Sequence, residues 1–176
     1  MRKVVLFIAM SLDGFIADAY GHVDWLSGQR PNEDDMRTYK EFIKGVDSVV
    51  MGWKTYHQIV TELSREDWFY KDLNSFVITH HDIVSNEKIT AVHGDICAFV
   101  EILKKEEGKN IWICGGADVV RQLMKQQMID RYHISIIPTI LGDGVRLFSG
   151  VEGERKLKLV KTESYNGIVD VIYEQR

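Results

Sequence analysis

The feature that most constrains this chain is a short apolar run that ends in two glycines and continues with a helical pattern, IWICGGADVVRQLM at residues 111–124. An apolar run of this length is typical of a strand that is buried on both faces of a sheet. Gly115 and Gly116 have no Cβ atom, so the backbone can turn sharply there and lie close to another group. The N–H groups at the start of the following helix suit an anion such as a nucleotide phosphate. A tight turn between a strand and a helix, without any ligand, explains the same residues.

The same order of strand and helix extends through the first two-thirds of the chain. Strands are predicted at residues 4–10, 47–51, 75–79, 88–92 and 111–114, and helices at residues 32–45, 52–63, 95–108 and 117–124. After residue 130 the pattern changes to strands only, at residues 131–138, 156–164 and 168–174, and Asn166-Gly167 predicts a type I′ turn between the last two. We therefore predict an α/β fold with a mostly parallel central sheet, antiparallel C-terminal strands and helices on both faces.

Three of the predicted strand ends carry residues that suit a ligand. In a sheet of this kind, ligands bind outside the carboxyl ends of the strands. These ends are residues 51–55, 79–81 and 114–117, and together they outline a groove with two helix N-termini and basic groups. A phosphate-bearing cofactor would satisfy all three. The chain has no third glycine at the dinucleotide spacing and no Walker lysine, which disfavours the usual Rossmann dehydrogenase and the P-loop NTPase.

Composition and charge exclude several classes of protein. The chain has 176 residues, which fits a single domain over residues 1–176, and its net charge of −4 argues against a large nucleic-acid interface. No apolar run approaches the ~20 residues that cross a membrane, so we expect a cytoplasmic protein with no membrane partner. The two cysteines, Cys97 and Cys114, lack the spacing of metal ligands and are expected to be core thiols. We expect no metal at His80-His81 either, because a third ligand at a suitable spacing is missing.

Four motifs, in order, relate the chain to a known family. SLDGFIA at residues 11–17, VVMGWKTYHQI at 49–59, ICGGADVV at 113–120 and IIPTILGDGVRLF at 136–148 resemble motifs of the dihydrofolate reductase superfamily. The chain looks most similar to the reductase domain of the riboflavin-biosynthesis deaminase–reductase, the RibD C-terminal family, over nearly its whole length. The resemblance implies a three-layer dihydrofolate reductase-like fold and an NADPH-dependent oxidoreductase. It also implies a cis peptide bond between Gly115 and Gly116.

The resemblance assigns individual residues to the cofactor. Ala9 and Ile16 would lie beside the nicotinamide. The positions that would meet the phosphates, the adenosine and the rest of the nicotinamide end are Gly52, Trp53, Lys54, Thr55, Thr79, His80, Gly115, Gly116, Ala117 and Asp118. The family usually has arginine where this chain has Trp53, so a two-pronged contact with phosphate is lost and Lys54 supplies only a point charge. His80 and His81 could compensate in part.

Reduction of a C=N bond needs a proton at nitrogen, and two aspartates are candidates for the acid that favours it. We expect Asn32 to cap a helix that has Asp35 in its first turn and Tyr39, a substrate contact, one turn later on the same face. This arrangement resembles the acid and aromatic residue of dihydrofolate reductase, and Ser135 resembles the hydroxyl that supports the acid. Asp13 is the second candidate acid. The alternatives are that Asp35 only stabilises the helix dipole and that Asp13 only forms a turn.

The leading expectation for function is a reductase of a pyrimidine or pterin-like heterocycle, most similar to the 5-amino-6-(5-phosphoribosylamino)uracil reductase of riboflavin biosynthesis. A dihydrofolate reductase-like enzyme and a non-catalytic NADP(H)-binding sensor are the alternatives, and Trp53 favours the sensor. The resemblance implies a homodimer that forms through the C-terminal strands. Pro138 in the strand at residues 131–138 predicts that this strand is an edge or contains a bulge. A monomer with a blunted edge is the other interpretation.

Overall fold

The computed structural model describes residues 1–83 and 85–176, and its strands form one large sheet and one small ribbon. The strands are β1 (Val4–Ser11), β2 (Phe15–Ala17), β3 (Val46–Gly52), β4 (Asn74–Ile78), β5 (Ile89–Val92), β6 (Asn110–Gly115), β7 (Arg131–Ile137), β8 (Val145–Arg146), β9 (Leu157–Tyr165) and β10 (Ile168–Gln175). The helices are α1 (Arg37–Phe42) with its 3₁₀ extension (Ile43–Gly45), α2 (Trp53–Gln58) with its π-helical extension (Ile59–Leu63), α3 (Ile96–Lys105) and α4 (Ala117–Lys125).

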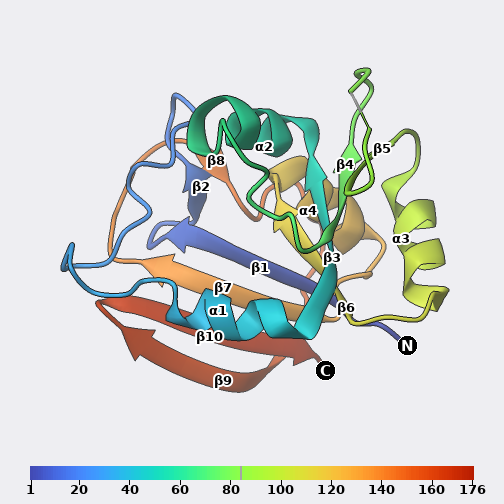
Figure 1. Ribbon diagram of the computed structural model, residues 1–176. Coiled ribbons are helices and arrows are strands. Elements are labelled where there is room, and N and C mark those ends of the chain that lie inside the picture. Colours follow the sequence, from blue (N-terminus) through green and yellow to red (C-terminus); the bar gives the residue numbers. More distant parts are fainter. Residues whose placement is uncertain (84) are drawn as a thin grey trace.

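The large sheet has the strand order β5-β4-β3-β6-β1-β7-β10-β9 (Figure 1). Neighbouring strands from β5 to β7 are parallel, whereas β10 is antiparallel to β7 and β9 is antiparallel to β10. β1 therefore lies in the middle of the sheet, between β6 and β7. This arrangement confirms the predicted mostly parallel sheet with antiparallel C-terminal strands.

Alternate residues of the central strands pack against opposite layers of helices. In β3, Val50 belongs to a core with α3 and α4, whereas Val49 and Met51 belong to a core with α1 and α2. In β6, Ile113 lies in the first core and Trp112 in the second. Figure 1 shows α1 in front of the strands β7 and β10. Because both faces are covered, each of these strands contains a continuous apolar run, Val49–Met51 in β3 and Ile111–Cys114 in β6, which is why the sequence predicted them.

The first helix begins later than predicted. α1 begins at Arg37, not after Asn32, and its first turn contains no acidic residue. The carboxylate of Asp35 instead accepts hydrogen bonds from the N–H of Gly28, at 2.8 Å, and from the side-chain amide of Asn166, at 2.6 Å. Asn166 is 131 residues away in the chain, so a local helix signal could not reveal this contact. The contact with Asn166 holds Asp35 in the loop before α1. The prediction that Asp35 lies in the first helical turn was therefore wrong.

Two predictions about the C-terminal strands had opposite outcomes. Asn166 and Gly167 have φ angles of 45° and 77°, and the two positive values confirm a type I′ turn between β9 and β10. The prediction from Pro138 was wrong, because β7 pairs with β1 on one side and β10 on the other with a continuous register. Pro138 follows the last residue of β7, where no ladder hydrogen bond is lost.

No helix in the described ranges, 1–83 and 85–176, has the length and apolar character needed to cross a membrane.

Candidate active site

Six parallel strands end along one edge of the sheet. They end at Ser11, Gly52, Ile78, Val92, Gly115 and Ile137. α2 begins directly after β3, and α4 begins one residue after β6, so two helix N-termini lie at this edge. Ligands of parallel sheets bind at such an edge, because loops and helix N-termini converge there.

The N-termini of α2 and α4 lie close together because glycines precede both helices. A Cβ atom on Gly52 would be 3.3 Å from Cγ2 of Val119, and one on Gly116 would be 3.5 Å from Oγ1 of Thr55. Neither N-cap glycine offers a side-chain acceptor, whereas Asp95 caps α3 by accepting a hydrogen bond from its backbone. The first N–H groups of α2 and α4 are thus left available for an anion. The Gly115–Gly116 bond is cis, as the resemblance implied.

Aromatic and basic side chains surround the start of α2. The ring of Trp53 lies 4.6 Å from that of His81 and 5.3 Å from that of His57. Trp53, His57 and the exposed Lys54 line a small cavity of about 230 Å³. Thr79 is buried, and its hydroxyl accepts a hydrogen bond from the N–H of His81 at 2.8 Å. The structure therefore places His81 against Trp53, whereas the sequence favoured His80 as the neighbour of the adenosine phosphate.

The remaining predicted cofactor residues lie on different sides of this edge. Ala9 pairs with Ser135 across β1 and β7, on the same face as α1, while Ile16 packs into the core on the face of α3 and α4. Asp118 lies in the first turn of α4, where Arg121 and Gln122 donate hydrogen bonds to its carboxylate. The bond from Arg121 is the main reason that the pKa of Asp118 is below its ordinary value. The Asp118 side chain therefore interacts with its own helix.

Asp13 connects the turn after β1 to the loop that follows β7. Its carboxylate accepts hydrogen bonds from the hydroxyl of Ser11 at 2.6 Å, from the N–H of Gly142 at 2.7 Å and from the N–H of Leu141 at 3.1 Å. These bonds, first of all the one from Ser11, lower the pKa of Asp13 to about 2. A carboxyl group with this pKa is ionised at neutral pH. The role of Asp13 as an acid stays a prediction, and its contacts support the turn interpretation.

Tyr39 belongs to a group of aromatic rings beneath α1. Its ring lies 5.9 Å from that of Trp112 and 6.4 Å from that of Phe7, and Phe42 contacts both of these rings. Burial raises the pKa of Tyr39 to about 12, so its hydroxyl keeps its proton. Tyr39 thus lies on the face of the sheet that carries Ala9 and Ser135, as a substrate contact would require. Asp35, its predicted partner, lies in the preceding loop.

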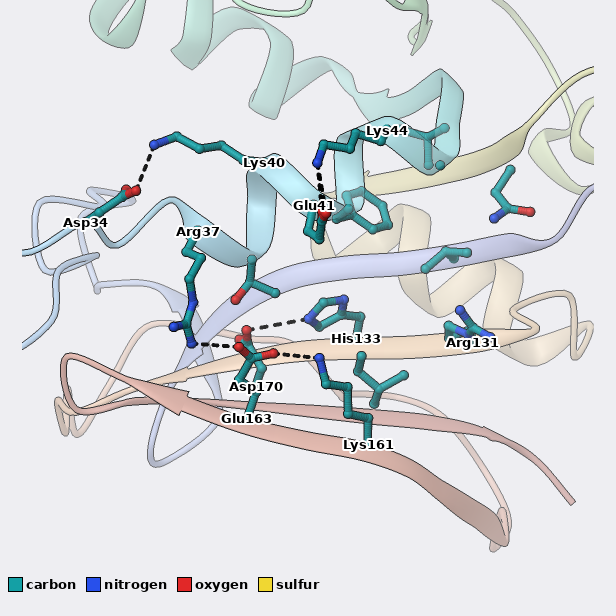
Figure 2. A pocket seen from close by; sticks show the side chains of 17 residues that line it. Asp34, Arg37, Lys40, Glu41, Lys44, Arg131, His133, Lys161, Glu163 and Asp170 are labelled. Atoms are coloured by element: carbon teal, nitrogen blue, oxygen red, sulfur yellow. Dashed lines mark hydrogen bonds and ion pairs between the residues drawn. The ribbon is translucent and has the colours of Figure 1, made fainter.

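A cavity of about 740 Å³ lies between α1 and the strands β7, β9 and β10 (Figure 2). Five cations line it, namely Arg37, Lys40, Lys44, Arg131 and Lys161. Three carboxylates beside them are those of Asp34, Glu41 and Glu163. Most of these charges are paired, since Arg37 and Lys161 both bind Glu163, and Lys40 and Lys44 bind Asp34 and Glu41. Arg131 is paired with Glu174, so the rim of the cavity is a network of ion pairs.

The floor of the same cavity contains buried polar residues that sequence reasoning missed. Asp170 is 1% exposed and His133 is 5% exposed, and both line the cavity. Ser135, which was predicted, pairs directly with Asp170 across β7 and β10. The signal was present in the sequence as polar residues at alternate positions of two apolar strands, RYHISII and IVDVIY. Alternate residues of a strand share a face, so these polar side chains point to one side of the sheet.

Comparison with known proteins agrees with this architecture. Residues 2–171 match the sequence pattern of one protein family, the RibD C-terminal domain. The chain belongs to the RibD C-terminal domain family. The motif resemblance seen in the sequence is thereby confirmed at the level of the family.

Individual proteins show how far the similarity extends. The uncharacterized protein YwjB of Bacillus subtilis is 38% identical over 173 residues, which cover 98% of this chain and 97% of YwjB. A crystal structure of a candidate riboflavin biosynthesis protein from Shewanella sp. PV-4 has a TM-score of 0.84 and 29% identity, and covers 99% of both chains. The deaminase/5-amino-6-(5-phosphoribosylamino)uracil reductase of Thermotoga maritima shares the fold at a TM-score of 0.72 and 16% identity, over 99% of this chain and 57% of its own.

Proposed function

We propose that the protein is an NADPH-dependent reductase that transfers a hydride to a pyrimidine-like heterocycle. The observation that carries this proposal is the pair of helix N-termini, α2 and α4, that meet at the edge of the sheet without a side-chain cap. Family membership supports the class of reaction. The particular reaction that we propose is that of a 5-amino-6-(5-phosphoribosylamino)uracil reductase, the activity named for the relative from Thermotoga maritima.

The residues at the helix N-termini fit a phosphate-bearing dinucleotide. Side chains larger than hydrogen at Gly52 and Gly116 would approach Val119 and Thr55, so glycine at both positions lets the two helix N-termini, whose N–H groups suit a phosphate, lie close together. Lys54 adds a positive charge at the same place. When bound, NADPH supplies the hydride. The role of the protein is to bind the phosphates at these N–H groups and to orient the nicotinamide beside Ala9.

A non-catalytic NADP(H)-binding module is the second candidate, and one observation favours it. Both predicted acids are already hydrogen-bonded within the protein, Asp13 to Ser11 and two backbone N–H groups, and Asp35 to Gly28 and Asn166. Their carboxylates therefore have a structural explanation that needs no substrate. A reductase would need its proton from water or from another group in the pocket.

The first test is a titration of the protein with NADPH and, separately, NADH, followed by the fluorescence of Trp53 and the other tryptophans. We expect NADPH to bind at micromolar concentration, and Lys54→Met to weaken NADPH binding more than NADH binding. Lys125→Met, at the opposite end of α4, is the matched control and should bind as the wild type does. NADPH oxidation with 5-amino-6-(5-phosphoribosylamino)uracil then tests turnover. Binding without turnover supports the binding module, and no binding of either nucleotide contradicts both candidates.

A homodimer through the C-terminal strands is also part of the proposal. β9 is an edge of the sheet, and its side chains Leu159 and Val160 are exposed. An apolar edge strand is a surface on which a second copy of the chain can pair. Light scattering after size-exclusion chromatography should give twice the chain mass, and Val160→Lys should reduce it to that of one chain. A single-chain mass for the wild type contradicts this part.

A further inference from the structure

The floor of the cavity beneath α1 holds buried polar groups whose hydrogen bonds are unmade. Among the described residues, neither carboxylate oxygen of Asp170 nor Nε2 of His133 has a hydrogen-bond partner, and the hydroxyl of Thr38, on α1 above them, has none either. The nearest approach is 3.7 Å, between Nε2 of His133 and Oδ2 of Asp170, which is too long for a hydrogen bond. Figure 2 shows both side chains on the floor, with α1 above them. A buried carboxylate in this state is costly unless donors reach it.

The cations at the rim do not supply these donors. Arg37 and Lys161 are hydrogen-bonded to Glu163, at 2.6 and 2.7 Å, and Arg131 is hydrogen-bonded to Glu174. None of these hydrogen bonds involves Asp170. The charge of Asp170 is nevertheless maintained: burial raises its pKa, but the polar neighbours, His133 first, lower the pKa by more, so that it lies below the ordinary value for aspartate. The floor therefore presents an ionised carboxylate beside the side chains of His133, Ser135 and Thr38, none of which is placed to make a hydrogen bond with it.

The position of Asp170 relates this floor to the predicted nicotinamide site. Ala9 pairs with Ser135, and Ser135 pairs with Asp170, so the three residues form a row across β1, β7 and β10. Phe7, two residues before Ala9, packs against His133 with ring centroids 4.4 Å apart, which places the whole row on the face under α1. Strands lie ~4.8 Å apart, so Asp170 is roughly 10 Å from Ala9. A substituted heterocycle that lies over Ser135, between the two residues, can therefore contact both of them.

We propose that Asp170 and His133 form the polar floor of the substrate pocket and bind adjacent N–H groups of a nitrogen heterocycle. The inference rests on the proposed reductase function and adds to it the residues that recognise the substrate. A carboxylate accepts two parallel N–H bonds, as a ring N–H beside an amino group would offer. The volume of about 740 Å³ is within the range of small-molecule sites. Arg37 and Lys161 share the one carboxylate of Glu163 at the rim, so they can also contact an anionic substituent on the same ligand, such as a phosphate.

The sequence pointed to Asp35 as the acid supported by Ser135, and the structure supplies a different acid for this hydroxyl. Ser135 lies directly opposite Asp170 in the sheet. Asp35 uses both of its oxygens in the loop before α1. The acid that faces the heterocycle thus comes from β10, close to the end of the chain, and not from the first helix.

The test is a titration of the full-length protein with 5,6-diaminouracil, followed by calorimetry, for the wild type and for Asp170→Asn. The asparagine keeps the shape of the side chain but turns one acceptor into a donor that faces the ligand donors. We expect binding to the wild type, and binding that is weaker by about tenfold or more in Asp170→Asn. Asp95→Asn, the same change of side chain at the N-cap of α3 on the other face of the sheet, is the matched control and should bind as the wild type does. Absence of binding to the wild type, or equal binding to Asp170→Asn, overturns the proposal.

A second measurement on the wild type covers the case in which Asp170→Asn does not fold. Imidazole ¹⁵N signals, with His133 assigned through His133→Gln, should shift when 5,6-diaminouracil is added. Unchanged His133 signals at saturating ligand overturn the proposal. NADPH titrations of the same proteins separate the two claims. If 5,6-diaminouracil binding depends on Asp170 but NADPH does not bind, the reductase function fails and the site stands; if NADPH binds and turns over with an unchanged KM in Asp170→Asn, the site fails and the function stands.

Discussion

The contact between Asp35 and Asn166 gives a quantitative test of whether Asp35 is an anchor or a proton donor. The side-chain amide of Asn166 donates to Asp35 at 2.6 Å and to the carbonyl of Arg30 at 3.0 Å, and its oxygen accepts from the N–H of Arg30 at 2.8 Å. Asp35 also accepts from the N–H of Gly28 at 2.8 Å. These bonds tie the loop before α1 to the turn between β9 and β10. If Asp35 is an anchor, its removal lowers the free energy of unfolding. If Asp35 is a proton donor, its removal lowers kcat.

The expected magnitudes follow from the bonds that each substitution removes. Asn166→Gly removes three side-chain bonds and keeps a residue that accepts the φ of 45°. At ~0.5–1.5 kcal/mol for each bond, we expect a loss of about 2–4 kcal/mol in the free energy of unfolding. Asp35→Asn places a donor against a donor and should cost about 1–3 kcal/mol. Because both changes remove the same 2.6 Å bond, the double variant should lose about 1 kcal/mol less than the sum.

Urea unfolding of the wild type, the two single variants and the double variant measures this coupling. Glu41→Gln is the control, because Glu41 binds Lys44 on the exposed side of α1 and should be additive with Asn166→Gly within about 0.5 kcal/mol. A coupling indistinguishable from zero would refute the anchor. Turnover gives an independent check: an anchor predicts similar, small losses of kcat in Asp35→Asn and Asn166→Gly. A loss of about a hundredfold or more confined to Asp35→Asn would restore Asp35 as the acid.

Three further predictions concern the stability of the fold. Leu123→Ala, at a fully buried position of α4, should lower the free energy of unfolding by about 2–5 kcal/mol in urea, whereas a loss below 1 kcal/mol would contradict the close packing of this core. Asp95→Ala removes the cap of α3 and should cost about 1 kcal/mol, with Asp95→Asn close to the wild type; equal losses in both would mean that the cap is not the cause. Hydrogen bonds from Lys3 and Arg131 lower the pKa of Glu174 to about 2, from an ordinary value of 4.5. Its stabilisation is therefore complete above about pH 5 and is lost as the pH falls toward 2, so the difference in Tm between the wild type and Glu174→Gln should shrink over that range, and a constant difference would exclude this carboxylate as the cause.

The elements that could be predicted from the sequence are those whose signals are local. The strands around Val49 and Ile113 are continuous apolar runs, because helices cover both faces of the sheet. Asp95 is a cap that needs only the next two residues, and Asn166-Gly167 specifies its turn by its own φ angles. The start of α1 could not be predicted in this way, because the partner of Asp35 lies on the last hairpin.

The candidate site was predicted in part for the same reason. The glycines at the ends of β3 and β6 belong to short motifs, so a sequence comparison finds them. Asp170 and His133 become a site only through the register of β10 on β7 and through the position of α1 above them. A polar residue in an apolar strand shows that something unusual is present at that position. The topology of the sheet decides which other strand completes the site, and topology is not a local property of the sequence.

The central place of β1 in the sheet has a consequence for how the chain is made. Its two neighbours, β6 and β7, are formed by residues 110–115 and 131–137, so β1 has neither partner until the ribosome has released most of the chain. The first hundred residues contain β3, β4 and β5, which pair with one another, but not the strands that join β1 to them. During synthesis β1 therefore stays unpaired, and its apolar side chains are accessible to chaperones or to other chains. Rates of synthesis across residues 110–137 should consequently affect the yield of folded protein more than rates elsewhere.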